Sequence, residues 1–471
     1  MVEHSEGPRV EGPPAVPAGR RGGAAVGALG TPALGDVRKE WDRLAALLPA
    51  GFKERALVHG DAGDAVRDFV GPGAVQQFAR LLGVEPKAEL PRLAASDGRR
   101  DFSPEERQRR QVKELEGHVQ RLLRGADAAR HAFLLANTTL IRTLAPRGER
   151  FRMFRVPQQS PEVFAREVEP FRKILAGDVL GRIDEPMLPP DPRSRRVYDT
   201  PRWAGYEVVL DVYPDVVAWG ILLVPKGIRE GERRPVVVCQ HGRNGLPKDV
   251  VEGDSPAYHD FAARLADRGF VTFAPHNLYR GEDRYRMLNR KGNPLKLSMF
   301  SFITAQHRQT LGWLGTLPFV DPARVAFYGL SYGGETAVRV PPLLGGYCLS
   351  ICSGDFNDWA RKVASTDSDY SFTFTVEWEM PYFGMGKTFN YAELAYLMVP
   401  RPFMVERGHH DGVAPDEWVA SEYAKVRWVY DNLGLADRTA IEFFNGGHTI
   451  NGEGTFTFLH HHLKWPEPRA E

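Results

Sequence analysis

The sequence predicts an α/β protein, in which a mostly parallel sheet carries helices on both faces and follows a helical N-terminal region. Two observations predict this class. After residue 205, short runs rich in Val, Ile and aromatic residues alternate with segments of helical periodicity. Between residues 36 and 180, the apolar residues recur at helical spacing.

The composition is that of an ordinary globular protein. With 471 residues, 42% of them hydrophobic, the chain is long enough for a large core or for two or three domains. The 61 basic residues almost balance the 60 acidic ones, so the overall charge points to neither nucleic acid nor an anionic membrane surface as a partner. No apolar run approaches the roughly 20 residues that span a bilayer.

The first segment, residues 1–35, is rich in Pro, Gly and Ala without periodicity, which predicts a disordered tail. Arg20-Arg21 precedes a glycine-rich apolar stretch there, which is typical of a degenerate export signal at best. We therefore expect a cytoplasmic protein, with export as the alternative.

Residues 36–180 are predicted to form a helical N-terminal region. The best-marked helix starts at Ser103-Pro104-Glu105-Glu106, which supplies an N-cap, a proline in the first turn and a capping-box Glu. Its arginines alternate with glutamates, so we interpret it as a solvated face and not as a nucleic-acid contact. The proline-rich residues 181–204 are predicted to be an extended connector.

Residues 205–471 carry the strand–helix alternation and are predicted to be a catalytic domain. A hairpin is expected at 206–212 and 216–225, followed by strands at 235–240, 270–274, 325–328, 347–352, 402–406 and 439–444. Helices are expected at 258–268, 305–317 and 417–432. The aromatic-rich insert at about 365–398 is too long for a plain crossover, and we expect either a lid or pocket wall or a small subdomain core.

No metal or disulfide chemistry is predicted. Cys239, Cys348 and Cys352 form a sparse, odd-numbered set in predicted core strands, and we interpret them as buried apolar thiols. The run at 460–462 consists of three histidines, but adjacent helical residues point about 100° apart and cannot converge on one ion.

The main chemical signal is at 325–337. A strand-like run enters Gly329-Leu330-Ser331-Tyr332-Gly333 and then small residues that suit a helix start. Gly-x-Ser-x-Gly between a strand and a helix is typical of a nucleophile elbow, in which the serine occupies a tight, strained turn and the glycines leave room for crowded backbones. Ser331 is therefore the candidate nucleophile.

A base and an acid follow in chain order. Parallel strands gather their active groups where loops leave the carboxyl ends. Asp411 lies in the loop after the strand at 402–406, and His448 lies in a glycine-rich loop after the last strand. His448 would take the Ser331 proton as general base, and Asp411 would orient the imidazole and stabilise the imidazolium. Glu406 and Asp355 remain alternatives for the acid, and His448 as a structural loop residue remains the alternative for the base.

An acyl-transfer site also needs donors for the oxyanion. We expect the backbone N–H groups of Tyr332, next to the nucleophile, and Arg243, in the loop at 240–245, to supply them. The residues that we expect around the substrate are His241, Arg280, Glu282, His410 and Trp378.

Taken together, the His-Gly turn at 241–242, the elbow at 329–334, the Gly408-x-x-Asp411 loop and His448 resemble the α/β-hydrolase superfamily, within its dienelactone hydrolase and acetyl xylan esterase-like group. The resemblance covers about residues 205–465. It implies an eight-stranded, mostly parallel sheet and a cofactor-independent serine hydrolase with Ser331, Asp411 and His448 as the triad. Dienelactone hydrolases themselves use a cysteine where this chain has Ser331.

The leading functional hypothesis is a carboxylic ester hydrolase that acts through an acyl-enzyme, on acylated carbohydrate or other small acyl esters. Two hypotheses compete with it. A serine peptidase resembling the prolyl oligopeptidase group would share the catalytic domain but usually carries a β-propeller, and residues 36–180 show no repeat period. A non-catalytic binding scaffold would not need the three triad residues. We expect no nucleic-acid or membrane partner, and we leave a homo-oligomer open.

Overall fold

The computed structural model describes residues 2–5, 34–49, 58–61, 72–85, 103–140 and 160–468, apart from 367, 374, 376 and 378. The chain divides into two compact units, residues 1–111 and 112–471. The long helix α3 (Pro104–Arg124) belongs to both, and none of its described residues is buried.

The first unit contains two helices, α1 (Leu34–Ala46) and α2 (Pro72–Leu81), in the predicted helical region. It also contains two short strands, β1 (Val2–Ser5) and β2 (Val58–Asp61), which pair in parallel. The rest of the predicted disordered tail up to residue 33 lies outside the described residues, but β1 corrects that prediction at its first residues. A strand that exists only through a distant partner leaves no mark in local composition.

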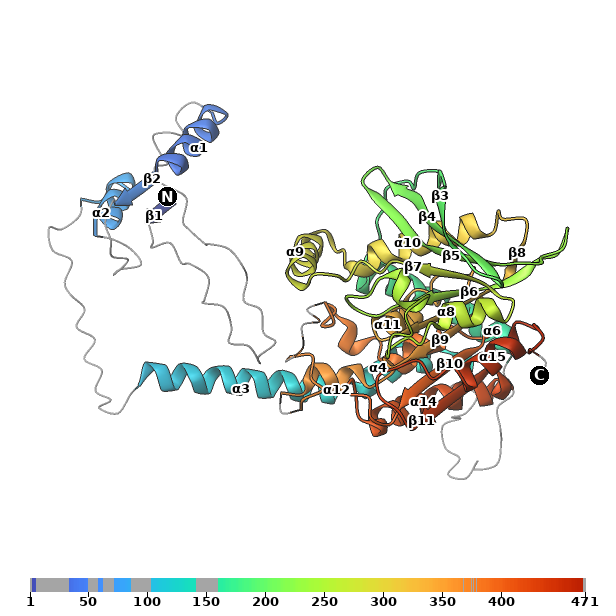
Figure 1. Cartoon of the computed structure of the whole chain (residues 1–471). Coiled ribbons are helices and arrows are strands. Elements are labelled where there is room, and N and C mark those ends of the chain that lie inside the picture. The colour runs from blue at the N-terminus through green and yellow to red at the C-terminus, as the bar shows by residue number, and fades with distance from the viewer. Residues whose placement is uncertain are drawn as a thin grey trace, which may run out of the picture. The chain divides into compact units, whose positions relative to one another are not determined.

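The second unit is built on one large sheet (Figure 1). Its strand order is β11-β10-β9-β8-β6-β7-β5-β4-β3. The strands are β3 (Arg193–Asp199), β4 (Trp203–Tyr213), β5 (Val216–Pro225), β6 (Arg234–Gln240), β7 (Val271–Pro275), β8 (Val320–Leu330), β9 (Leu349–Ser353), β10 (Phe403–Gly408) and β11 (Thr439–Phe444). The neighbouring strands from β11 through β10, β9, β8 and β6 to β7 pair in parallel. Strands β5, β4 and β3 extend the sheet beyond β7, and each pairs antiparallel with its neighbours. The predicted fold class and hairpin are confirmed.

The sheet has nine strands, not eight, because β3 lies in the predicted connector. Its side chains are nearly all exposed, so it lacks the apolar alternation that predicts a strand. It is held by its backbone ladder to β4 and by cross-strand ion pairs, with Arg195 Nε 2.6 Å from Glu207 Oε2 and Arg193 Nη2 2.5 Å from Asp211 Oδ1.

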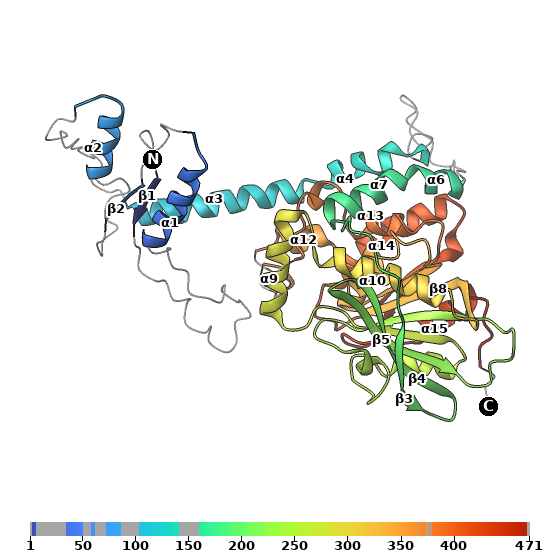
Figure 2. The ribbon, with the colours of Figure 1, turned by 90° about the horizontal axis from the view of Figure 1, so that it is seen from above.

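The helices of the second unit cover both faces of the sheet (Figure 2). Those described after α3 are α4 (Asp127–Phe133), α6 (Pro161–Glu167), α7 (Glu169–Ile174) with its π-helical extension η2 (Leu175–Val179), α8 (Phe261–Asp267), α9 (Glu282–Gly292), α10 (Met299–Leu314), α11 (Tyr332–Arg339), α12 (Trp359–Ala364), α13 (Tyr391–Tyr396), α14 (Asp416–Asn432) and α15 (Gly454–His462). Five short 3-10 turns complete this part: η1 (Leu135–Asn137), η3 (Pro247–Val250), η4 (Asn293–Leu295), η5 (Met385–Lys387) and η6 (Ala436–Arg438). Helix α10 begins before the predicted residue 305, because the Ser298 hydroxyl accepts a hydrogen bond from the Phe300 N–H and caps it.

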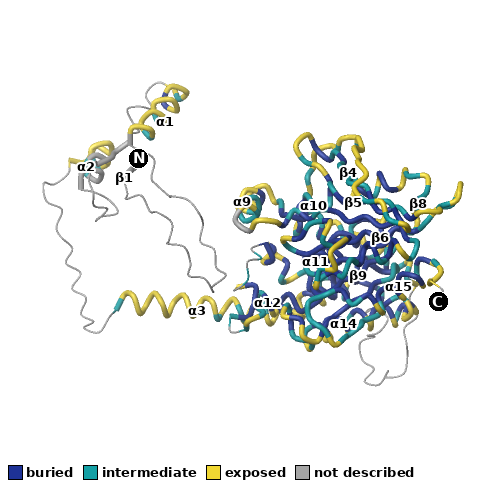
Figure 3. The backbone as a smooth tube through the Cα atoms, in the orientation of Figure 1, coloured by how far each residue is buried: buried dark blue, intermediate teal, exposed yellow. Residues whose placement is uncertain are grey.

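Two cores sandwich the sheet, which forms the buried centre of Figure 3. Successive side chains of β6 fall on opposite sides: Val236 and Val238 belong to one core, Val237 and Cys239 to the other. Both faces are therefore covered, which explains why this strand is apolar without alternation. Phe164 of α6 joins the first core, so this part of the N-terminal helical region packs directly onto the predicted catalytic domain.

The described part of the chain has no helix that is both long and apolar enough to cross a lipid bilayer. Cys239 and Cys352 are buried thiols, as predicted, whereas Cys348 lies just before β9 and is only partly buried. Within the predicted helical region, α4 is followed by η1, and residues 141–159 lie outside the described residues.

Candidate active site

Ser331 stands between β8 and α11, at the carboxyl end of a central strand. Its backbone has φ 61° and ψ −122°, outside the regions that a non-glycine residue normally adopts. Its N–H donates to the Ser353 carbonyl at the end of β9 (3.0 Å), and its carbonyl accepts from the Glu335 N–H in α11 (2.8 Å). These bonds hold the strained turn in place, as in a nucleophile elbow.

The glycines of the motif leave space for other backbone segments. A Cβ on Gly329 would lie 2.6 Å from the Gly333 backbone, and one on Gly333 would lie 2.4 Å from the Gln240 carbonyl oxygen. Neither position can hold a side chain unless β8, α11 or the end of β6 moves. The crowding is the reason why this turn needs glycine on both sides of Ser331.

His448 and Asp411 meet, although they come from different loops. Nδ1 of His448 lies 2.9 Å from Oδ2 of Asp411. The imidazole is also close to Gly354, where an added Cβ would stand 3.0 Å from Cε1 of His448. Because Gly354 follows the Ser353 carbonyl that binds the Ser331 N–H, the histidine and the serine lie at the same end of the sheet.

Asp411 is buried in a network of donors. The Val413 N–H donates to Oδ1 (2.9 Å), and Nη1 of Arg407 lies 3.0 Å from Oδ2. Arg407 also donates to the Asp411 carbonyl (2.9 Å), and both side chains are almost completely buried. Arg407 was not predicted as a site residue, because within β10 it resembles an ordinary strand-end charge in the sequence.

The other two candidate acids are engaged elsewhere. Glu406 is fully buried and accepts hydrogen bonds from Tyr328 Oη (2.8 Å) and Ser353 Oγ (2.6 Å), among others. Asp355 accepts from Tyr391 Oη (2.6 Å), and burial raises the pKa of its carboxyl to about 6. Neither carboxylate has a hydrogen bond to a histidine among the described residues.

The loop after β6 lies against the elbow. A Cβ on Gly242 would stand 2.9 Å from the Ser331 Cβ, so the Gly242–Arg243 peptide borders the serine. The Gly242 N–H donates to Tyr258 Oη (2.9 Å). Tyr332, the other expected oxyanion donor, is the first residue of α11, where N–H groups have no intrahelical partner.

His241 is a support of this loop and does not contact solvent. Its Nε2 accepts a hydrogen bond from the Asn277 N–H (3.1 Å), so Nδ1 carries the proton that reaches the Gly242 carbonyl (2.7 Å). Burial, partly offset by that carbonyl, lowers the pKa of His241 to about 3. We expected His241 around the substrate, but its side chain is fully buried and does not line a substrate pocket.

Of the other residues expected around the substrate, two are exposed on loops, one begins a helix and one lies outside the described residues. Arg280 is exposed and donates to the Asn244 carbonyl (2.8 Å), which ties the loop after β7 to the loop after β6. His410 is exposed, with Nε2 3.1 Å from Asn445 Oδ1. Glu282 is the first residue of α9, and Trp378 lies outside the described residues.

The insert at 365–398 contributes one residue near the elbow that was not predicted from the sequence. Glu379 is buried, its Oε1 has no hydrogen-bond partner among the described residues, and burial raises its pKa to about 8. Burial, and to a lesser degree the negative charge of Glu379, raise the pKa of the Tyr332 hydroxyl well above its usual value. The Tyr332 hydroxyl is likewise buried without a hydrogen-bond partner among the described residues. Other residues of the described insert, including Met385 and Phe389, pack into the main core, whereas Phe383 is exposed.

The sheet order, the covered faces and the strained serine between β8 and α11 define an α/β-hydrolase fold. No family model matches the chain. "Putative hydrolase YtaP" of Bacillus subtilis (strain 168) is 24% identical over 224 residues, which cover 45% of this chain and 73% of that protein.

Two solved structures illustrate the likeness of fold. A glucuronoyl esterase from Solibacter usitatus is 13% identical with a TM-score of 0.49, and the match covers 67% of this chain and 99% of that one. Acetyl xylan esterase 1 from Thermoanaerobacterium sp. JW/SL YS485 is 16% identical with a TM-score of 0.41, over 66% and 95% of the two chains. The proposal for function therefore depends on the residues of this chain.

Proposed function

We propose that this protein is a serine hydrolase that cleaves carboxylic esters through an acyl-enzyme on Ser331. The observation that carries the proposal is the strained turn of Ser331, against Gly242 and at the same sheet end as the His448–Asp411 pair. A serine held in a costly backbone conformation at the same end of the sheet as such a pair has the features of an activated nucleophile.

The proton path follows from the tautomer of His448. The ionised Asp411 carboxylate can only accept, so the Nδ1 atom that faces it carries a proton. Nε2 is then left with a lone pair for the Ser331 hydroxyl proton. As Ser331 Oγ attacks the ester carbonyl, His448 takes that proton and becomes an imidazolium that Asp411 stabilises; it then donates the proton to the leaving alcohol. Water repeats the sequence to release the acid.

The negative charge on the carbonyl oxygen needs donors that are in place before the reaction. The Tyr332 and Arg243 N–H groups belong to the two segments that flank Ser331. His241 fixes the second of them indirectly. Because a trans peptide points its C=O and N–H in opposite directions, the bond from His241 Nδ1 to the Gly242 carbonyl sets the direction of the Arg243 N–H.

For the substrate, we propose a short acyl ester of a polar, hydroxylated alcohol. Glu379 and the Tyr332 hydroxyl leave buried polar atoms unpartnered near the elbow. Such atoms are costly unless a water or a ligand satisfies them. A hydroxylated alcohol, as in an acylated carbohydrate, would supply donors and acceptors to both.

The test compares hydrolysis of p-nitrophenyl acetate, butyrate and octanoate, and of a peptide p-nitroanilide, by the wild type and Ser331→Ala. We expect turnover that favours acetate and falls at least about a thousandfold in the variant. The matched control is Ser368→Ala, a partly exposed serine in the insert.

A preference for the anilide would replace the esterase with a peptidase. Absence of turnover on every substrate, together with no labelling of the folded protein by a fluorophosphonate, would refute the hydrolase and favour a binding scaffold.

A further inference from the structure

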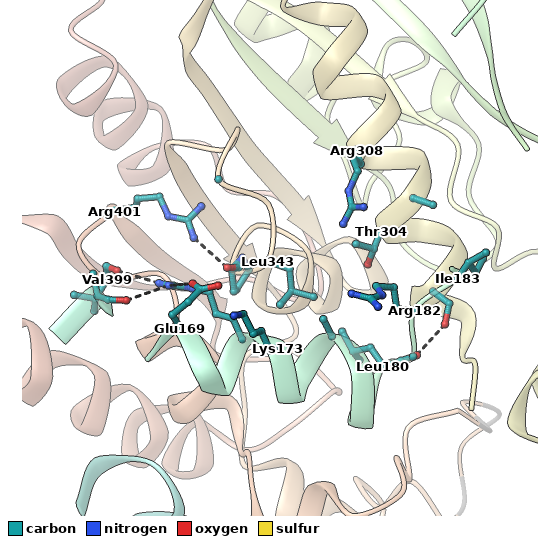
Figure 4. Close-up of a pocket in the computed structure, with 18 of the residues that line it drawn as sticks. Glu169, Lys173, Leu180, Arg182, Ile183, Thr304, Arg308, Leu343, Val399 and Arg401 are labelled. Atoms are coloured by element: carbon teal, nitrogen blue, oxygen red, sulfur yellow. Dashed lines mark hydrogen bonds and ion pairs between the residues drawn. The ribbon is translucent and has the colours of Figure 1, made fainter. Parts of the chain in front are cut away.

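A cavity lies apart from the residues placed around Ser331, none of which is in its lining. Helix α11 leads away from Ser331, and Pro342 and Leu343 follow its far end, while Arg401 lies two residues before the start of β10. These residues line a cavity of about 390 Å³ together with α7, η2 and α10 (Figure 4). Its volume falls in the range of small-molecule sites.

The lining is strongly cationic. Five basic side chains, Arg172, Lys173, Arg182, Arg308 and Arg401, face a single carboxylate, that of Glu169. Figure 4 labels Lys173 on α7, Arg182, Arg308 on α10 and Arg401, which come from separate segments of the chain.

Three of the five are already engaged. Arg172 pairs with Glu169 (2.9 Å) and donates to the Leu397 carbonyl (2.7 Å), and Arg182 pairs with Asp184 (2.9 Å). Arg401 donates to backbone carbonyls only, such as that of Tyr347 (2.8 Å). Burial and then the charge of Arg172 lower the pKa of Arg401 to about 10.

The other two have no such partners. Among the described residues, neither Lys173 nor Arg308 has a carboxylate within ion-pair distance or a side-chain hydrogen bond. Both are exposed, so they are accessible to a ligand from solvent. Beside Arg308 on the same helix, the Thr304 hydroxyl oxygen is buried without a hydrogen-bond partner in this part of the chain. Two uncompensated cations and one unsatisfied hydroxyl thus face the same cavity.

We propose that this cavity binds a small organic anion, with an oxyanion group on Lys173, Arg308 and Thr304. The remaining lining is largely apolar, through Ala165, Ala176, Leu180, Ile183 and Leu343. The ligand therefore combines a carboxylate or phosphate with a compact apolar body. The site does not depend on ester hydrolysis at Ser331, since its lining includes none of the residues placed around Ser331.

The test is calorimetric titration of the full chain with phenyl phosphate, phenylacetate, inorganic phosphate and benzyl alcohol. We expect one of the two organic anions to bind, inorganic phosphate to bind more weakly, and the neutral alcohol not to bind. Arg308→Gln and Lys173→Gln should each weaken binding about tenfold, the effect of one charged hydrogen bond. The matched control Arg233→Gln removes an exposed arginine that lies outside the lining and should leave binding within about twofold.

Both cavity residues are exposed, so thermal melting should show that the variants fold like the wild type. Absence of binding by both organic anions to the folded wild type would overturn the proposal. So would binding that Arg308→Gln and Lys173→Gln leave unchanged, which would place the anion elsewhere, including at Ser331. If inorganic phosphate binds as tightly as phenyl phosphate, the inference that the ligand has an apolar body is wrong.

Discussion

Nδ1 of His448 lies 2.9 Å from Oδ2 of Asp411, and of the three acids considered from the sequence only Asp411 has a hydrogen bond to a histidine among the described residues. The pair joins two loops that leave neighbouring parallel strands, β10 and β11. Because Asp411 also receives the Val413 N–H and the Arg407 charge, its position is set before any substrate arrives.

The first prediction separates Asp411 from Glu406. We expect Asp411→Asn to lower kcat for p-nitrophenyl acetate by about a hundredfold to ten-thousandfold, because the amide no longer stabilises the imidazolium. Glu406→Gln should instead lower the free energy of unfolding by about 1–3 kcal/mol, since an amide cannot accept every bond that Glu406 now accepts. Urea unfolding and steady-state kinetics on both variants measure this. A collapse of kcat in folded Glu406→Gln would assign the acid role to Glu406.

The sequence predicted local features best. The strand, turn and helix around Ser331 form one continuous pattern, and the glycines that flank the serine are required by backbone crowding within that pattern. The acid stayed open among Asp411, Glu406 and Asp355, because the paths of separate loops decide which carboxylate reaches His448.

Three features could not be predicted, for separate physical reasons. The edge strand β3 is held by backbone pairing and ion pairs, so its side chains show no apolar alternation. Arg407 and Glu379 are buried ionisable residues, and in a sequence such residues look the same as exposed ones. His241 was expected in the pocket because it neighbours the oxyanion loop, but only the fold shows that both ring nitrogens bind backbone.

A second prediction concerns His241 as a positioning residue. We expect His241→Leu to lower kcat about tenfold to a hundredfold with little change in KM, because the Gly242 carbonyl loses its donor and the Arg243 N–H loses its direction. His241→Asn, which retains a donor near Nδ1, should recover part of the loss. Burial holds the pKa of His241 at about 3, so the imidazole stays neutral above about pH 5. Above that pH, the pH–rate profiles of both variants should therefore have the same shape as that of the wild type. A shifted profile would show that His241 titrates during catalysis.

The third prediction tests backbone crowding at the elbow. A Cβ at Gly333 would stand 2.4 Å from the Gln240 carbonyl oxygen, so Gly333→Ala should reduce the free energy of unfolding by about 3 kcal/mol or more. Gly312→Ala is the matched control, because Gly312 lies within α10 and a Cβ added there would have nothing within 4 Å. That change should stabilise the protein by about 0.5–1 kcal/mol through helix propensity. Equal stabilities of the two variants would contradict the crowded turn.

The last prediction concerns pH and Glu379. Burial raises the pKa of its carboxyl in the folded protein to about 8, from an ordinary value of 4.5. A raised folded pKa means that the stabilising contribution is complete below about pH 4.5 and is lost as the pH rises through about 8. Glu379→Gln carries no such charge, so its stability relative to the wild type should rise with pH, by up to a few kcal/mol between about pH 5 and 9. Thermal melting of both proteins across that range measures the difference, with exposed Glu417→Gln as the matched control. A constant difference between Glu379→Gln and the wild type would show that this carboxyl does not titrate as a buried group.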